Sequence, residues 1–294
     1  MSTAVGLTHG SPVNRDSSRP RLIAIDVDGT LPAWSEAVQE TPEPVGSRLR
    51  TALRAAQAAG ASVVLCSGRS PQGITRVIDR LRLLDQAGGR LWMVAGNGTM
   101  VCRYAPLEIV HEQAFDAGPA VRAFLERRPS ALVAVEHGGV GYRLTAPFPA
   151  GELPGEMIVT DLADLLARPV SRVIIRDPAS TPGEFMRIVG GLRLPGASYS
   201  IGWSAWLDLT PVGVSKESGL RYVCAELDLT ASDVLAIGDG RNDIEMLSWA
   251  GRGVAVGQAP PEVRAAADAV IEAAEDDGVA LELERWFGRR HGAR

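Results

Sequence analysis

The sequence predicts an α/β fold, with a doubly wound, mostly parallel sheet that carries an inserted α+β domain. Strands buried on both faces of a parallel sheet read as continuous apolar runs, and such runs recur at 21–27, 61–67, 91–95, 233–239 and 253–256. Helical periodicity lies between these runs, as in Leu49, Leu53 and Ala56. Alternation of strand and helix is typical of a doubly wound sheet.

The helix after the second apolar run has a clear beginning. Ser70 is predicted as its N-cap, and Pro71 stands at the first helical position, where a missing N–H costs nothing. Its apolar residues recur at helical spacing, at Ile74, Val77, Ile78 and Leu81.

The middle of the chain has a different pattern. Short strand candidates lie within 99–145, with turn signals at Asn97-Gly98 and Gly138-Gly139. A helical candidate at 118–128 lies among these strands. Helical candidates at 160–167 and 183–192 flank a strand at 170–176, and the α/β pattern resumes near 206. We therefore expect a flexible tail at 1–20, a core domain at 21–98 and 206–294, and an inserted domain at 99–205.

Composition restricts the class of protein. The chain has 294 residues, 46% of them apolar, which is enough for about two globular domains. A net charge of −5 argues against nucleic-acid binding, and no apolar stretch reaches the length of a membrane span. Three scattered cysteines fit neither a disulfide framework nor a zinc site, and residues 1–20 have no apolar signal region. We expect a cytoplasmic protein with reduced thiols.

Two acidic pairs follow predicted strands. Asp26 and Asp28 end the first strand, and Asp239 and Asp243 follow the fourth. Side chains two apart on a strand share a side, so the first pair can converge at the edge where open α/β sheets bind ligands. Converging carboxylates require a cation or a shared proton. Taken alone, each pair also fits an ordinary turn or helix cap.

Two further signals accompany the acidic pairs. Ser67 and Gly68 lie where the second strand leads into a helix, and a hydroxyl with backbone N–H groups there can hold a phosphate, although Ser-Gly is also a common turn. Lys216 is the only lysine among 30 basic residues. A solvated surface lysine is the ordinary alternative. Since a surface position would accept arginine, however, this lysine indicates a role for a compact ammonium group. Together these elements predict one Mg²⁺–phosphate site.

These motifs resemble those of the haloacid dehalogenase (HAD) superfamily. The residues DVDGTL at 26–31, Ser67-Gly68-Arg69, Lys216 and GDGRNDIEML at 238–247 occur in the order of its Cof-type phosphatases with a type-IIB cap. The similarity covers 21–98 and about 206–288, and it implies a Rossmann-like core. Ser67 stands where threonine is common, and Pro32 and Trp34 lie in a segment that forms a flap in the family.

The resemblance implies a role for each residue. Asp26 is expected as the nucleophile that forms an aspartyl-phosphate, and Asp28 as the general acid and base. Lys216 is expected to offset phosphoryl charge, while phosphate or substrate contacts are expected from Thr30, Ser67, Gly68 and Asn242. Mg²⁺ is the implied cofactor, with ligands from Asp26, the Asp28 backbone carbonyl, Asp239 and Asp243.

The implied substrate is a small phosphate monoester, with sugar phosphates first and FMN or pyridoxal phosphate second. A sugar phosphomutase and a non-catalytic sensor of phosphorylated ligands remain alternatives. Dehalogenation is disfavoured because Asp28 has no task when halide leaves. No nucleic-acid or membrane partner is expected, and the sequence gives no oligomeric state.

Overall fold

The computed structural model describes residues 19–32, 46–84, 89–202 and 204–288. Most of the expected tail, and Trp34 of the expected flap, lie outside these ranges. The chain divides into two compact units, one of 1–64 with 227–294 and one of 65–226. Each unit is described by itself.

The first unit contains a parallel sheet with strand order β14-β13-β12-β1. Its central strand β1 (Leu22–Ile25) is fully buried, as its continuous apolar run predicts. The other strands are β12 (Val234–Gly238), β13 (Arg252–Ala255) and β14 (Ala269–Val270). The helices are α1 (Ser47–Ala58), α8 (Ile244–Trp249), α9 (Pro261–Ala266) and α10 (Gly278–Phe287).

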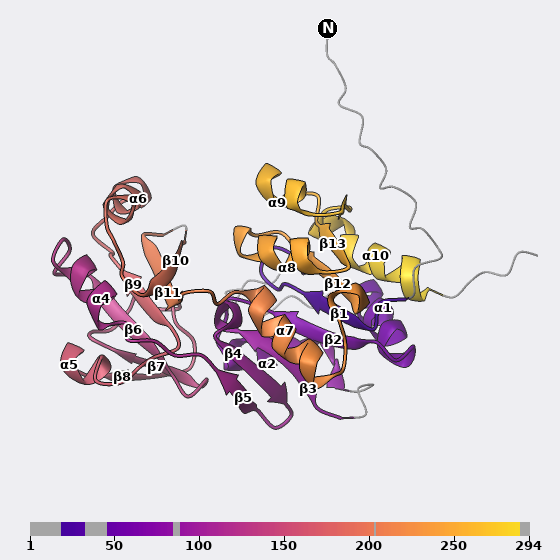
Figure 1. The fold of residues 1–294 in the computed structure, drawn as a ribbon, viewed down its shortest axis with the longest axis horizontal. Helices are drawn as coiled ribbons and strands as arrows, with labels where there is room; N and C mark the ends of the chain where they lie inside the picture. The colour runs from indigo at the N-terminus through magenta and orange to yellow at the C-terminus, as the bar shows by residue number, and fades with distance from the viewer. Residues whose placement is uncertain (1–18, 33–45, 85–88, 203, 289–294) are drawn as a thin grey trace, which may run out of the picture. The chain divides into compact units, whose positions relative to one another are not determined.

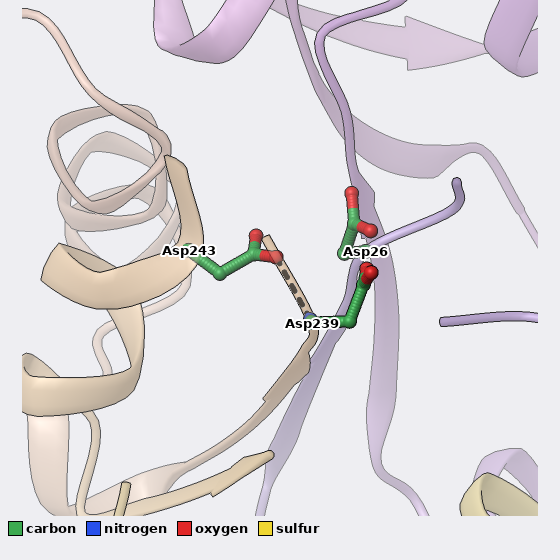
Figure 2. A group of neighbouring side chains, drawn as sticks. All are labelled: Asp26, Asp239 and Asp243. Atoms are coloured by element: carbon green, nitrogen blue, oxygen red, sulfur yellow. Dashed lines mark hydrogen bonds between the residues drawn. The ribbon is translucent and has the colours of Figure 1, made fainter. Parts of the chain in front are cut away.

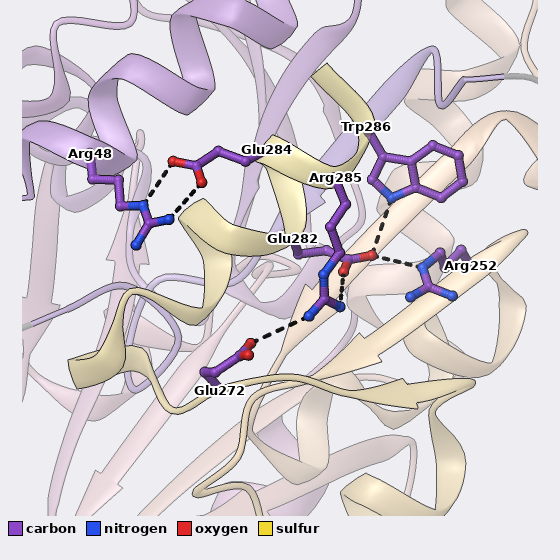
Figure 3. A network of polar contacts seen from close by, with 7 residues as sticks. All are labelled: Arg48, Arg252, Glu272, Glu282, Glu284, Arg285 and Trp286. Carbon is purple, nitrogen blue, oxygen red and sulfur yellow. Dashed lines mark hydrogen bonds and ion pairs between the residues drawn. The ribbon is translucent and has the colours of Figure 1, made fainter. Parts of the chain in front are cut away.

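Helix α10 is held to its neighbours by ion pairs (Figure 3). Arg48 of α1 binds Glu284 through two hydrogen bonds of 2.8 and 2.7 Å. The fully buried carboxylate of Glu282 accepts from Arg252 at 2.8 Å, from Arg285 at 2.9 Å and from Trp286 at 3.1 Å. Because both oxygens of Glu282 are satisfied, this buried charge is compensated where it lies.

Strand β2 (Ser62–Cys66) begins in the first unit and ends in the second, where it pairs in parallel with β3 (Leu91–Ala95). Two antiparallel strands follow, β4 (Met100–Tyr104) and β5 (Glu108–Glu112). Helix α2 (Pro71–Leu81) starts as predicted, since the Ser70 side chain accepts from the Gly73 N–H and Pro71 is its first residue. Helix α7 (Lys216–Glu226) completes this part.

The second unit also contains a six-stranded sheet with the order β10-β11-β9-β6-β7-β8. Its strands are β6 (Leu132–His137), β7 (Gly141–Leu144), β8 (Glu156–Val159), β9 (Val173–Arg176), β10 (Ala197–Ile201) and β11 (Trp206–Pro211). An apolar core built around Phe124 and Phe185 covers one face. The helices over this face are α4 (Gly118–Leu125), α5 (Leu162–Leu165) and α6 (Pro182–Gly190) (Figure 1).

The α/β fold class is confirmed, and three strands differ in their partners from the sequence expectation. Strands β4 and β5, expected in the inserted domain, extend the sheet of β3. The reason is local: Asn97 (φ 56°) and Gly98 (φ 103°) reverse the chain directly after β3. Strand β11, expected near the return to the core, pairs with β9 and β10. The boundaries 99–205 for an inserted domain stay a prediction.

Candidate active site

Asp26 lies at the carboxyl end of β1. Its N–H continues the parallel ladder by donating to the Ile237 carbonyl at 2.9 Å, and the residue is 4% exposed. Asp28, two residues on, is exposed. Gly29, the residue after Asp28, has a φ of 89°. A β-carbon on Gly29 would lie 2.3 Å from Asp239 Oδ2. Only glycine allows the chain to pass so close to that carboxylate.

The second acidic pair follows β12 and is held by backbone hydrogen bonds. Asp243 Oδ2 accepts from the Asp239 N–H at 3.0 Å and from the Gly240 N–H at 2.8 Å (Figure 2). Asp243 is completely buried. A β-carbon on Gly238 would lie 2.5 Å from Asp243 Cγ, so this glycine permits the close approach.

These carboxylates form one cluster (Figure 2). Asp26, Asp239 and Asp243 each place an oxygen within 4.8 Å of the others. The buried Thr30 hydroxyl lies 3.1 Å from Asp26 Oδ2 and 3.0 Å from Asp239 Oδ1. A set of carboxylate oxygens fits a hard cation such as Mg²⁺. The Asp28 carboxylate is not part of this cluster, and Asn242 lies exposed in the turn between the paired aspartates.

Ser67 and Gly68 lie in the second unit, against the turn that follows β3. Ser67 is buried, its N–H donates to Val94 at 2.9 Å, and its hydroxyl accepts from the Arg69 N–H at 3.1 Å. The Asn97 N–H donates to the Ser67 carbonyl at 3.0 Å. A β-carbon on Gly68 would lie 3.2 Å from the Asn97 amide, so that side chain covers Gly68 closely.

Lys216 is the first residue of α7 and is 1% exposed. A solvated surface lysine is therefore excluded. The residue before it packs on the same turn, because a β-carbon on Gly98 would lie 1.9 Å from the Ser215 carbonyl oxygen. Ser67, Gly68 and the start of α7 thus all lie against the turn at 96–98.

Two residues with structural roles at these sites were not singled out from the sequence. Asn97 was noted only as a turn residue, and its side chain lies against Gly68. Gln258 donates its amide N–H to the Gly29 carbonyl and accepts from the Ala274 N–H at 3.1 Å. A glutamine that bridges two distant loops leaves no periodic signal in a sequence.

The cysteines show no sign of a catalytic function. Cys66, Cys102 and Cys224 are all buried. Burial raises the pKa of the Cys102 thiol to about 12, with a further contribution from Glu136, so it remains protonated at neutral pH.

Comparison with known proteins decides the family. The family model for haloacid dehalogenase-like hydrolases matches residues 23–127 and 177–283, more than half of the chain. The chain belongs to this family. The chain is therefore a hydrolase related to phosphatases, which agrees with the resemblance seen in its motifs.

Relatives of this hydrolase carry phosphatase names. The HMP-PP phosphatase of Yersinia pestis (strain Pestoides F) is 26% identical over 292 residues, covering 92% of this chain and 97% of its own. YxeH of Bacillus subtilis (strain 168), for which a phosphatase activity is proposed, is 27% identical over 281 residues, covering 88% and 96%.

Solved structures share the fold of this hydrolase over about nine tenths of the chain. A haloacid dehalogenase-like hydrolase from Bacteroides thetaiotaomicron has a TM-score of 0.72 at 25% identity and covers 91% of this chain and 99% of its own. The HAD subclass IIB sugar phosphatase BT4131 has a TM-score of 0.72 at 22% identity, covering 90% and 98%, which supports the fold. None of the helices in the described ranges combines the length and apolarity needed to cross a bilayer.

Proposed function

We propose that this hydrolase is a Mg²⁺-dependent phosphatase that cleaves small phosphate monoesters through an aspartyl-phosphate on Asp26. The observation that carries the proposal is the cluster of Asp26, Asp239 and Asp243 at the carboxyl ends of β1 and β12. Sugar phosphates are the first substrate class, with FMN or pyridoxal phosphate second. This order rests on the family and on the sugar phosphatase among the solved structures.

The residues present fit a magnesium ion. Asp26, Asp239 and Asp243 would supply carboxylate oxygens, and Asp28 its backbone carbonyl. When bound, the ion offsets the negative charge that otherwise repels a carboxylate nucleophile from a phosphate. Thr30 supports this arrangement, because its hydroxyl links two of the three carboxylates.

The proposed reaction has two displacements at phosphorus. An Asp26 carboxylate oxygen forms a bond to phosphorus while the ester P–O bond breaks, and Asp28 gives its proton to the leaving alkoxide. Water then attacks phosphorus, its proton passes to Asp28, and the bond to Asp26 breaks. Asp28 is exposed, which suits a group that exchanges protons with a substrate and with water.

The remaining residues are proposed to position the phosphoryl group. Ser67 and Gly68 offer a hydroxyl and backbone N–H groups, and Asn242 offers an exposed amide. Lys216 supplies a positive charge that burial keeps from water. Such electrostatic positioning is the main contribution of proteins to phosphoryl transfer.

The test is orthophosphate release from a panel of small phosphate monoesters. The wild-type enzyme should release phosphate with Mg²⁺ and stop in EDTA. Asp26→Asn should lose turnover by about 10³-fold or more, because an amide cannot serve as the nucleophile. Glu245→Gln, an exposed carboxylate of α8, is the matched control and should keep wild-type activity.

Other outcomes would overturn the assignment. Substantial turnover in folded Asp26→Asn would remove this residue as nucleophile. Isomerisation of hexose phosphates without phosphate release would indicate a phosphomutase. A ligand-induced rise in Tm without any turnover would indicate a sensor of phosphorylated ligands.

A further inference from the structure

The turn at Gly96–Gly98 contacts each element that carries a predicted phosphate-binding residue of the second unit. Its Gly96 N–H donates to the Arg69 carbonyl at 2.9 Å, and its Asn97 N–H donates to the Ser67 carbonyl at 3.0 Å. On the other side, Gly98 packs on the Ser215 carbonyl just before Lys216. A shift of this turn would therefore move both the Ser67 segment and the start of α7.

The six-stranded sheet comes near this turn at Arg172, the residue directly before β9. Its Cδ lies 3.9 Å from the place that a β-carbon on Gly96 would occupy. Asp208 of β11 holds the guanidinium, with Nε at 2.8 Å and Nη2 at 2.6 Å from Oδ1. Asp208 is itself fixed by the Trp206 indole N–H at 3.0 Å. The arginine side chain is only 8% exposed.

A second buried carboxylate keeps Arg172 in place. Glu136 has a fully buried side chain, and within the described part of the chain neither of its oxygens accepts a hydrogen bond. Its Oε2 lies 3.7 Å from Arg172 Nη1. Asp208, Glu112 and Tyr142 also lie near this group, and Arg172 supplies the positive charge beside them. Moving Arg172 away would leave Glu136 buried without a cation, which is costly.

The last residue of β9 provides a matched comparison for Arg172, which directly precedes that strand. Arg176 lies four residues after Arg172, so both side chains leave the same face of the sheet. Arg176 pairs with Glu152 at 3.0 to 3.1 Å and is 13% exposed. The two arginines share burial and ion pairing, but the ion pair of Arg176 joins β9 to the segment between β7 and β8.

We propose that Arg172 is a positioning residue: it fixes the Gly96–Gly98 turn, and through this turn the Ser67–Arg69 segment and the Lys216 end of α7. Its catalytic consequence rests on the proposed phosphatase function. Its structural consequence is independent of any substrate, because the turn and its hydrogen bonds are properties of the folded chain.

The experiment compares Arg172→Met with Arg176→Met, since methionine keeps an apolar stem and removes the charge. Amide hydrogen exchange should rise about tenfold or more in peptides covering 94–99 and 67–70 of Arg172→Met, and stay within twofold in Arg176→Met. Phosphate release should show a kcat lowered about tenfold or more by Arg172→Met, with a smaller change in KM, because small misplacements at a reacting centre are expensive.

A conservative variant separates positioning from general loss of stability. Arg172→Lys keeps the charge and most of the stem, but loses the fork that binds Asp208. It should recover part of the kcat and of the exchange protection. If Arg172→Met does not fold, Asp208→Asn is tested in its place. That change keeps the arginine and weakens the ion pair that binds its guanidinium.

The two proposals fail in different ways. Equal exchange at 94–99 in the Arg172 and Arg176 variants would overturn the positioning role, whatever the activity. Absence of phosphate release from the wild-type enzyme would overturn the proposed function, while the exchange comparison would still decide the role of Arg172.

Discussion

Two buried glutamates form ion pairs with arginine that differ in their hydrogen bonding. Glu282 of α10 accepts three hydrogen bonds and has both oxygens satisfied (Figure 3). Glu136 of β6 is equally buried, yet Arg172 approaches it only to 3.7 Å and gives its hydrogen bonds to Asp208. Burial raises the pKa of Glu136 to about 7, and Arg172 offsets only part of this shift.

The two glutamates differ in the hydrogen bonds that their carboxylates accept from the described residues. Glu282 joins a strand and a helix of one unit, and its charge is fully compensated. Arg172, whose Cδ lies near the Gly96 turn, compensates the buried charge of Glu136 only in part. Burial of a charge therefore indicates stability only when its hydrogen bonds are complete.

The largest effect is expected from breaking the satisfied network. Glu282→Leu removes the acceptor of Arg252, Arg285 and Trp286 and leaves their donors buried or partly buried. The free energy of unfolding should fall by about 3–4 kcal/mol. Urea unfolding measures it, with exposed Glu245→Gln as the control. A loss no greater than in that control would show that the network contributes nothing.

Glu136→Gln should change how stability depends on pH. Because the pKa of Glu136 is raised from 4.5 to about 7 on folding, its contribution to stability is complete below pH 4.5 and is lost as pH rises through 7. Glutamine does not titrate. Relative to wild type, the variant should therefore gain about 2–3 kcal/mol of stability between pH 4.5 and pH 8.

Urea unfolding of both proteins across this range provides the measurement. Other titrating groups are shared, so the difference between the two curves isolates position 136. Parallel curves from pH 4.5 to pH 8 would contradict a pKa raised by burial.

The smallest effect compares two buried threonine hydroxyls. Thr30 contacts Asp26 and Asp239, whereas Thr99 Oγ1 has no hydrogen-bond partner among the residues that the structure describes. Thr30→Val should cost about 1–2 kcal/mol in metal-free protein, and Thr99→Val about 0.5 kcal/mol or less. Thermal unfolding in EDTA measures both. Equal losses would show that hydroxyl partners do not decide the cost.

Much of the core could be predicted because its signals are local. Continuous apolar runs gave β1, β2, β3 and β12, and the Ser70-Pro71 pair gave the beginning of α2. Strands β8 and β10 were not predicted. All four residues of β8 are exposed, so the strand has no buried face to produce an alternating pattern.

In the candidate site too, some residues have local sequence signals and others have none. The rule for strand ends predicts the observed cluster of Asp26, Asp239 and Asp243. The single lysine among 30 basic residues indicated a position that needs an ammonium group, at Lys216. The roles of Asn97, Gln258 and Arg172 could not be predicted, because each acts on a loop distant in sequence.

The sequence by itself determined the α/β class and the family, and it supplied the residues that we propose for phosphoryl chemistry. These follow from apolar periodicity and from motifs at strand ends, which are local properties of the chain. Only the tertiary structure decided that β4 and β5 extend the sheet of β3, that Lys216 is buried, and that the Glu136 carboxylate accepts no hydrogen bond from the residues that the structure describes. Burial and hydrogen-bond completion depend on which segments pack together, and no local pattern encodes that packing.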